Sequence, residues 1–362
     1  MALRPLIGHR ALRAGLAAAW LDDRLPASLL FQGRRGVGKQ RLALWLGALM
    51  VCERVRDQRL REACGDCQHC RYASRGVHPD VHWFFPRPRV GGDPSPDDVA
   101  ADLSEAIAER MEHDGLWTAP PGMDGLHVAT VRALVHQSTL RPAMAKHALF
   151  VVGDAERMVS QEGADEAANA FLKLLEEPPP TSHIVMTTSE PGALLPTIRS
   201  RVVTVRVPPL SPGDVGEFLD DVAVHRRIGT TPRAESLARA NGAPGDLLSG
   251  ESAASNFAAA RRLLEAALQP ASPAGVADRM KAAARQGVSG ARGSFTDTLD
   301  ALTVVLSLHV RQLVAQGRHS EARRASGAMS LVEQSKLRAR GNVSPQLLGA
   351  SLLHGLHKAL RS

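Results

Sequence analysis

Short apolar runs alternate with helical segments between residues 28 and 206. Five of these runs have the length of strands and are apolar at nearly every position, at residues 28–32, 81–84, 148–152, 183–187 and 202–207. Strands that are buried on both faces have this composition, and strands that alternate with helices usually form a parallel sheet. The pattern therefore predicts an α/β domain built on a central parallel sheet.

Helical segments lie between the predicted strands. Helices are expected after Lys39, over residues 128–139 and over residues 165–177, where three successive prolines stop the last one. The alternation is interrupted at about residues 87–124, where Pro- and Gly-rich ends flank a predicted helix over residues 99–111. We interpret this segment as an insertion, and the sequence does not indicate its role.

No further strand is predicted after Pro208 and Pro209. The next residues read as a small helical unit, and the chain beyond residue 255 is alanine-rich and helical. A chain of 362 residues is too long for one ordinary core. We therefore expect an α/β core at 1–208 followed by two helical domains, at 209–252 and 253–362.

Composition limits the classes of function. Hydrophobic residues make up 44% of the chain, but no apolar stretch reaches the roughly 18 residues that span a bilayer. The N-terminus also lacks the apolar segment and cleavage site of a signal peptide, so we expect a cytoplasmic protein without membrane contact. The net charge of +7 favours proximity to an acidic polymer, whereas an aromatic content of 4% argues against a stacking platform for single-stranded bases.

All four cysteines of the chain lie in one short segment, at Cys52, Cys64, Cys67 and Cys70. Four thiolates complete the tetrahedral shell of a zinc ion, and a C-x-x-C turn brings two sulfurs onto one centre. Disulfides are the alternative, but the cytoplasm keeps thiols reduced and a redox pair does not need two further cysteines. Residues 52–70 therefore predict a structural Zn²⁺ site with no open coordination position. We expect Asp66 and His69 to be surface residues rather than ligands.

A glycine-rich loop follows the first predicted strand and opens a helix. It has the spacing of a P-loop, in which backbone N–H groups and a lysine hold phosphates, and the candidate residues are Gly33, Gly36, Gly38 and Lys39. Gln40 stands where a Ser or Thr hydroxyl should bind Mg²⁺. An amide on a longer side chain is a poor substitute, so ATP binding by this chain is in doubt. The alternative is a strand-to-helix turn that binds nothing.

The third predicted strand leads to Asp154, which has the position of a second magnesium ligand. The next residue is Ala155, where ATPases place a glutamate that polarises water. Glu156 lies one residue further on and is expected to point elsewhere, because one step reverses the side-chain direction along an extended chain. The missing base and the missing hydroxyl together argue against efficient ATP hydrolysis.

Three stretches resemble the clamp-loader branch of AAA+ proteins. They read D-A-E-R-M at 154–158, A-A-N-A-F-L-K-L-L-E-E-P-P at 167–179 and L-P-T-I-R-S-R at 195–201. The helix that ends in L-E-E-P-P and the S-R-C motif belong to that branch, although Val202 replaces the cysteine here. The His78-Pro79-Asp80 triplet and the position of the cysteines after the P-loop helix are similar as well. The resemblance covers about residues 1–250 closely.

Within this branch the chain resembles the delta-prime family of bacterial DNA polymerase III subunits. Motor subunits keep a lid arginine, and Gly245 stands at its position here. The resemblance implies a stationary subunit without ATPase activity of its own, with an AAA+ core, a lid and a helical collar that closes a hetero-pentamer. The implied partners are gamma/tau motor subunits and a delta subunit, and through the complex the sliding clamp and primed DNA.

The same resemblance gives Arg201 a specific role. In this family the S-R-C arginine, here preceded by Ser200, enters the ATP site of a neighbouring subunit as an arginine finger. The alternative is a surface arginine in a helix-to-strand turn. Two other functions stay open from the sequence, an ATP-hydrolysing gamma/tau-like motor of the same complex and a zinc-dependent nucleic-acid-binding protein.

Overall fold

The computed structural model describes residues 2–117, 125–158, 165–229, 231–285, 292–339 and 344–361. The chain divides into two compact units. The first comprises Met1–Thr230 and Gly242–Leu248, and the second comprises Thr231–Asn241 and Ser249–Ser362. The chain thus enters the second unit for one short helix, returns to the first, and then completes the second.

The first unit is built on a five-stranded parallel sheet with the strand order β2-β3-β4-β1-β5. The strands are β1 (Ser28–Gln32), β2 (Val81–Phe84), β3 (Ala148–Val152), β4 (Ser182–Thr188) and β5 (Val203–Arg206). Each predicted strand is confirmed to within one residue at either end. The expectation that all of them are buried on both faces is wrong for β5, because it is an edge strand in which Val203 is 51% exposed.

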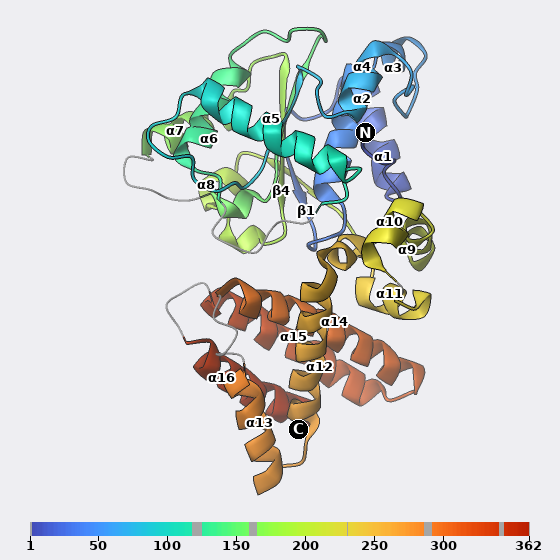
Figure 1. Ribbon diagram of the computed structural model, residues 1–362, viewed down its shortest axis with the longest axis vertical. Helices are drawn as coiled ribbons and strands as arrows, with labels where there is room; N and C mark the ends of the chain where they lie inside the picture. The colour runs from blue at the N-terminus through green and yellow to red at the C-terminus, as the bar shows by residue number, and fades with distance from the viewer. Residues whose placement is uncertain are drawn as a thin grey trace. The chain divides into compact units, whose positions relative to one another are not determined.

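Helices cover both faces of the sheet (Figure 1). One side carries α1 (Arg10–Leu21), α2 (Lys39–Val51), α3 (Glu53–Asp57) and α4 (Gln68–Ser74), and the other carries α6 (Val128–Ser138), α7 (Asp165–Glu176) and α8 (Pro196–Arg199). The helices predicted after Lys39, at 128–139 and at 165–177 are confirmed. Because the strands are parallel, their carboxyl ends meet at one edge of the sheet, which is where ligand sites of such sheets form.

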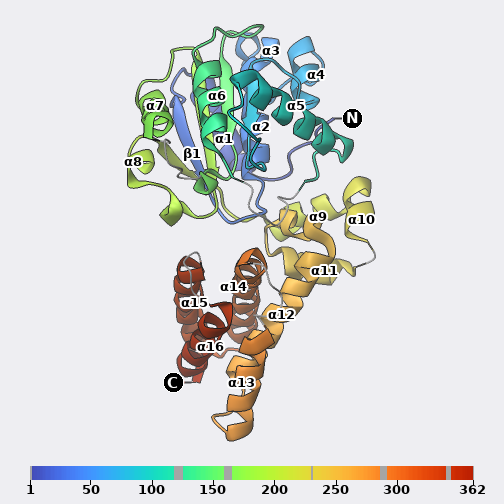
Figure 2. The same cartoon turned by 60° about the vertical axis from the view of Figure 1, so that its left-hand side comes forward.

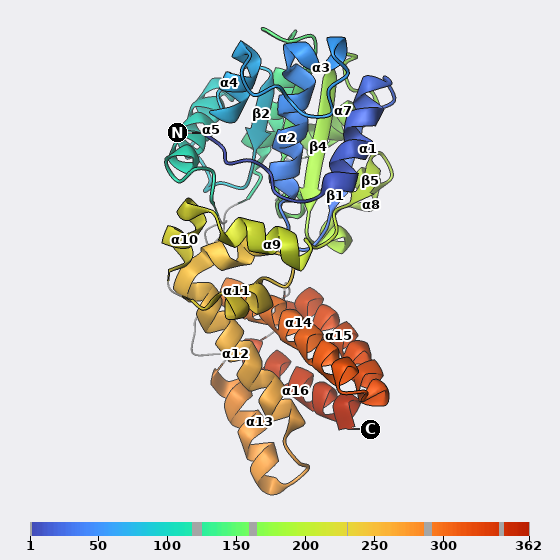
Figure 3. The same cartoon turned by 90° about the vertical axis from the view of Figure 1, so that its right-hand side faces the viewer.

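The insertion forms α5 (Pro96–Glu112), which lies beside the edge strand β2 (Figure 3). This helix begins earlier than predicted because Ser95 and Asp98 form a capping box, in which each side chain accepts from the backbone N–H of the other. Arg87 and Gly125 pair as an isolated bridge at the base of the insertion. Residues 118–124, its second Pro- and Gly-rich end, lie outside the described residues.

The first unit ends with α9 (Pro212–Leu219), α10 (Val222–Ile228) and the start of a 3-10 segment (Pro244–Ser249). Arg10 of α1 pairs with Asp214 of α9 at 2.6 Å. Arg4 pairs with Asp221, the N-cap residue of α10. The N-terminal segment is therefore tied to these short helices by ion pairs.

The second unit is helical throughout its described residues (Figure 2). Its helices are α11 (Arg233–Ala240), α12 (Gly250–Leu268), α13 (Pro273–Arg285), α14 (Arg292–Ala315), α15 (His319–Ala339) and α16 (Pro345–Arg361). Helices α12 to α16 enclose a core in which Leu299, Leu306 and Leu356 are fully buried. The window Phe295–Ala315 of α14 is long and apolar enough to cross a membrane, but its buried side chains belong to this core, which accounts for the same pattern.

Candidate functional site

The P-loop turns from β1 into α2, as predicted. Gly38 caps the N-terminus of α2 with a φ of 95°, a left-handed conformation that suits glycine. Lys39 is buried, and its Nζ donates to the carbonyl oxygens of Gly33 (2.9 Å) and Arg34 (3.0 Å) and to the Ser189 hydroxyl (2.9 Å). The lysine that would reach a phosphate is thus satisfied by its own chain.

Gln40 fills the position expected for the magnesium-binding hydroxyl. Its Nε2 donates to Oδ2 of Asp154 (3.1 Å), and its Oε1 accepts from Nε1 of Trp83 (2.9 Å). A Cβ atom at Gly153 would lie 2.6 Å from the Gln40 amide, so a side chain at position 153 would displace this amide. The carboxylate of Asp154 therefore meets an amide where P-loop ATPases place Mg²⁺. The residues present do not fit a magnesium ion.

Glu156 does not point away from this site, and the expectation from the sequence is wrong. Its carboxylate accepts from the Ser189 backbone N–H at 2.9 Å, and the Ser189 hydroxyl accepts from Lys39. Residues Ala155–Arg157 form a 3-10 turn, so the alternation of an extended chain does not apply to them. Burial raises the pKa of Glu156, and the charge of Asp154 acts in the same direction. Burial lowers the pKa of Lys39, while Asp154 and Glu156 oppose that change.

Residues 243–248 lie directly on the P-loop. The backbone N–H of Gly245 donates to the carbonyl oxygen of Gly36 at 2.9 Å, and Asp246 pairs with Arg34 at 2.7 Å. A Cβ atom at Gly245 would lie 2.8 Å from the Cα atom of Gly36. A side chain at position 245 would therefore require the backbone to move.

Arg201 is the last residue of the L-P-T-I-R-S-R stretch and lies just after α8. Its Nε and Nη2 both contact Oε1 of Glu176 at 2.5 Å, and its Nη1 donates to the carbonyl oxygen of Thr197 at 2.8 Å. Nη1 also approaches the hydroxyl of Ser200 at 3.4 Å. The guanidinium is therefore held on the surface by Glu176, the last residue of α7, a partner that the sequence did not indicate.

The four cysteines come together, as predicted. Their sulfur atoms all lie within 4.8 Å of one another. The sulfurs of Cys64 and Cys70 are 3.8 Å apart, a separation that suits two ligands of a tetrahedral ion with bonds of about 2.3 Å.

The backbone N–H groups of Cys64, Cys67 and Cys70 each donate to a cysteine sulfur at 3.4 Å, which favours thiolates. Burial raises the pKa of the Cys70 thiol, and a bound cation reverses such a change. The cluster could hold a metal ion.

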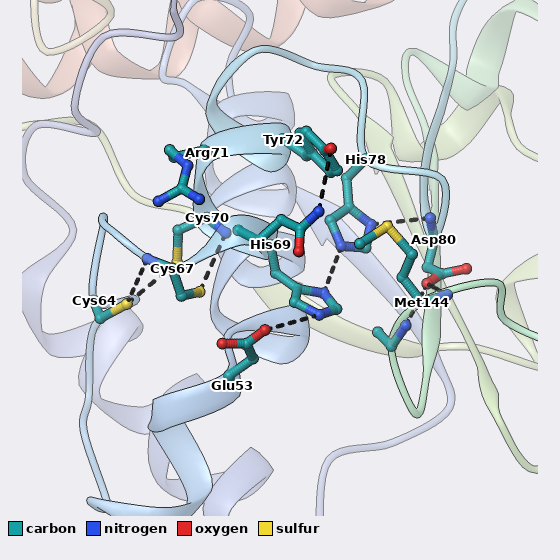
Figure 4. Close-up of polar contacts among 12 residues, drawn as sticks. Glu53, Cys64, Cys67, His69, Cys70, Arg71, Tyr72, His78, Asp80 and Met144 are labelled. Atoms are coloured by element: carbon teal, nitrogen blue, oxygen red, sulfur yellow. Dashed lines mark hydrogen bonds and ion pairs between the residues drawn. The ribbon is translucent and has the colours of Figure 1, made fainter.

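Asp66 is exposed, as expected, but His69 is 9% exposed and the expectation of a surface residue is wrong. Figure 4 shows why, because His69 lies against His78 on the inner side of α4. The backbone N–H of Asp80 donates to Nδ1 of His78 (3.0 Å), so Nε2 of a neutral His78 carries the proton and donates to Nδ1 of His69 (2.8 Å). Nε2 of His69 then faces Glu53 at 3.4 Å. These contacts are satisfied when both rings are neutral and each carries its proton on Nε2.

The carboxylate of Asp80 extends this chain of contacts to the loop before β3. It accepts the backbone N–H groups of Ala143 (2.5 Å), Met144 (2.8 Å) and Ala145 (2.6 Å). Asp80 is 1% exposed, so these donors replace the water that a buried carboxylate loses. The His78-Pro79-Asp80 triplet thus connects the cysteine segment to the sheet.

Three histidines, of which His78 is buried and His82 and His183 are half-buried, should make the fold sensitive to acid. Burial lowers the pKa values of His78, His82 and His183 to about 4. An unfolded histidine has a pKa of about 6.5. The unfolded chain therefore binds protons at a higher pH than the folded chain does. The folded state has its full stability above about pH 6.5, and it loses stability as the pH falls from about 6.5 towards about 4.

His183 offers the cleanest test, because it lies beside Trp20 and His147 and not among the cysteines. Replacing His183 by Gln is expected to reduce the slope of the free energy of unfolding against pH by about 1 kcal/mol per pH unit between about pH 6 and 4.5. Urea titrations at a series of pH values measure this slope. Parallel curves for the two proteins would contradict the assignment.

Comparisons with known proteins agree with the predicted resemblance. A sequence model of the family described as DNA polymerase III, delta subunit, matches residues 8–211. The chain is 28% identical over 205 residues to a protein named DNA polymerase III subunit delta' from Bacillus subtilis, which covers 56% of this chain and 49% of that one. It is 26% identical over 186 residues to the protein of the same name from Escherichia coli, covering 51% and 43%.

Similarity extends to a second kind of subunit. The chain is 25% identical over 236 residues to DNA polymerase III subunit tau from Escherichia coli, which covers 65% of this chain and 30% of that one. The matched segments span about half or less of the length of these relatives. The part that the family model matches, residues 8–211, lies within the unit that holds the P-loop and the cysteine cluster.

Proposed function

Since the chain belongs to the family described as DNA polymerase III, delta subunit, whose sequence model matches more than half of it, we propose that it is the stationary, delta-prime-type subunit of a sliding-clamp loader. In this function it assembles with gamma/tau motor subunits and a delta subunit in a cytoplasmic hetero-pentamer. The complex loads the sliding clamp onto primed DNA, and this chain contributes contacts and an arginine finger rather than ATP hydrolysis. Its second helical unit serves as the collar.

The contact between Gln40 and Asp154 is the observation that carries this proposal. A motor subunit needs both positions to bind Mg²⁺, and here they bind each other. Two further losses support the same conclusion, because Ala155 offers no base and Gly245 no cation. Glu156 does not stand at the position of the base, and its Oε1 atom accepts from the Ser189 backbone N–H.

Purified chain is expected to show no ATP turnover above the blank in the presence of Mg²⁺. The reason is that the magnesium ligands, the base and the lid cation are all missing or engaged. Phosphate release measured for the chain and for Lys39→Ala tests this expectation. Sustained turnover that Lys39→Ala abolishes would show that the chain is a motor.

The motor is the second candidate function, and one observation favours it. The match to subunit tau covers 65% of this chain, more than the match to the Bacillus subtilis delta' protein, which covers 56%. A shared core accounts for this coverage equally well, because stationary and motor subunits differ at a few site residues. The site residues described above favour the stationary subunit.

Arg201 is proposed to act on ATP that is bound by a neighbouring subunit. A local site in which Lys39 and Gln40 are satisfied within the chain has no use for a finger of its own. Arg201 lies at the surface, where a neighbouring chain can approach, and its side chain is 28% exposed. Stabilisation of transition-state charge is the contribution that such a residue makes.

The cysteine cluster is proposed to hold one structural Zn²⁺. Cys52, Cys64, Cys67 and Cys70 offer four sulfurs, which would fill the tetrahedral shell and leave no position for a substrate. Zinc bound there would join the ends of the segment that links α2 to α4. Its contribution is stability of the first unit rather than chemistry.

A further inference from the structure

The guanidinium of Arg201 is held in one orientation by its own chain. Its Nε and Nη2 atoms both contact Oε1 of Glu176 at 2.5 Å. Its Nη1 atom donates to the carbonyl oxygen of Thr197 at 2.8 Å and approaches the Ser200 hydroxyl at 3.4 Å. A guanidinium binds an oxyanion most tightly through two N–H groups of one edge. The edge formed by Nε and Nη2 is occupied by Glu176.

Core packing sets the distance between these two charged residues. α7 and α8 are neighbours on one face of the sheet (Figure 2). Leu175 directly precedes Glu176 and is 2% exposed, and Ile198 lies three residues before Arg201 and is 3% exposed. Both apolar side chains belong to the main core of the first unit. The two charged side chains therefore extend from fixed backbone positions, although each of them is partly exposed.

Glu176 does not stabilise the helix to which it belongs. It is the last residue of α7, where the helix dipole has its negative end and disfavours a carboxylate. Lys173 in the same turn has the charge that suits this end. The contact with Arg201 offsets the unfavourable position of the carboxylate, and it gives the guanidinium a fixed orientation.

We propose that Glu176 is a positioning residue that holds Arg201 until the phosphate of a nucleotide on a neighbouring subunit displaces the carboxylate. This inference rests on the proposed function, because it assumes that Arg201 acts on such a nucleotide. A carboxylate and a phosphate compete for the same Nε and Nη2 atoms, and their negative charges repel each other. A partly exposed pair of this kind favours the held orientation by about twofold to fivefold, so a phosphate can displace it.

Chemical modification of the isolated chain tests the held orientation without a neighbouring subunit. Phenylglyoxal modifies arginines, and it reacts more slowly with a guanidinium that a carboxylate engages. Peptide mass spectrometry gives the rate at each arginine. Glu176→Gln keeps the size of the side chain and removes its charge, so Arg201 should react about two to five times faster in this variant. Arg199 is exposed at the end of α8 and serves as the internal reference.

Glu177→Gln is the matched control. Glu177 is exposed, carries the same charge one residue further on, and is not among the described contacts of Arg201. Arg201 should therefore react at the unaltered rate in this variant. Both substitutions are at exposed positions, so the Tm should stay within about 2 °C of that of the unaltered chain. Equal reaction of Arg201 in Glu176→Gln and Glu177→Gln would overturn the proposal.

A reconstituted clamp loader tests the displacement. Glu176→Gln should raise the clamp- and DNA-stimulated ATPase rate of the site that Arg201 serves by about twofold to fivefold, because no carboxylate has to leave the guanidinium first. A pair that only stabilises the fold would not raise this rate. The gain should disappear when Arg201→Ala is added, and it should be absent in Glu177→Gln. An unchanged or lower rate in Glu176→Gln would contradict the proposal.

Failure of this inference differs from failure of the proposed function. If Arg201→Ala leaves the ATPase rate of an assembled complex unchanged, Arg201 is not a finger, and displacement by a neighbour's phosphate is wrong with it. If Arg201→Ala lowers the rate but Glu176→Gln does not raise it, the finger stands. Only the role of Glu176 is then wrong.

Discussion

Replacing Cys67 and Cys70 together by serine is expected to abolish zinc binding and to lower the Tm of the first unit by about 10–20 °C. Both side chains are buried in the main core of that unit, beside residues of α2. A serine hydroxyl is a poor zinc ligand, and two remaining thiolates cannot hold the ion tightly. The double variant therefore loses the cross-link and leaves buried hydroxyl groups in its place.

Elemental analysis and a thermal melt measure the two effects. Unaltered protein prepared without chelators should contain one zinc per chain, and the double variant none. Asp66→Asn is the matched control, because it changes an exposed side chain between the same cysteines and keeps all four sulfurs. Unaltered protein without zinc and with four freely titratable thiols would rule out the site.

Arg201→Ala is expected to lower the ATPase rate of a reconstituted clamp loader without preventing its assembly. An electrostatic contact made only in the transition state contributes about 10²–10³ in rate at the site it serves. Arg201 would serve only one ATP site of the complex, so the total ATPase rate is expected to fall by the part of the rate that this one site contributes. Clamp- and DNA-stimulated ATPase, with assembly checked by sizing, gives the measurement.

Arg199→Ala is the control for this prediction. Arg199 is exposed and lies two residues before Arg201 at the end of α8, so its removal changes the local charge equally. Unchanged ATPase and clamp-loading rates in an assembled Arg201→Ala complex would refute the finger. If assembly itself fails, Arg201 is an interface residue, and Arg201→Lys then shows whether charge or the planar fork matters.

The ion pair with Glu176 sets a condition on this role. Nε and Nη2 of Arg201 contact Glu176, and Nη1 is engaged by Thr197. The guanidinium must exchange at least part of these contacts to reach a phosphate on a neighbour. A partly exposed ion pair such as Arg201–Glu176 contributes up to about 1 kcal/mol of stability. A charge-assisted contact between the guanidinium and a phosphate is stronger, so it can replace this pair.

The sheet could be predicted from the sequence because its strands are short and almost uniformly apolar. β3 and β4 are central and buried, so their composition alone marks them. The position of β5 is predicted correctly, but the assumption of burial on both faces does not hold because β5 lies at the edge. Ser95 and Asp98 form a capping box, and this spacing is the sequence signal for the earlier start of α5.

The cysteine cluster and the altered P-loop were also predictable, because each depends on residues at short spacing. The two wrong expectations have different causes. His69 is buried because it contacts His78, which follows α4 in the chain. Glu156 lies towards the site because a local 3-10 turn follows Asp154 and because its carboxylate accepts from Ser189. No local pattern in a single sequence marks Ser189 or Arg110. Ser189 contacts Lys39 and Arg110 packs on Trp83, and both partners are distant in the sequence.

The close approach of Gly245 to Gly36 limits what position 245 can accept. Two backbones in contact leave no volume for a side chain there, so a single substitution cannot place a cation at this position without a shift of the backbone. Residues 243–248 would have to move away from the P-loop, with loss of the contacts that hold them there, including the pair of Asp246 with Arg34. An experiment that introduces an arginine at position 245 therefore has to release these contacts as well.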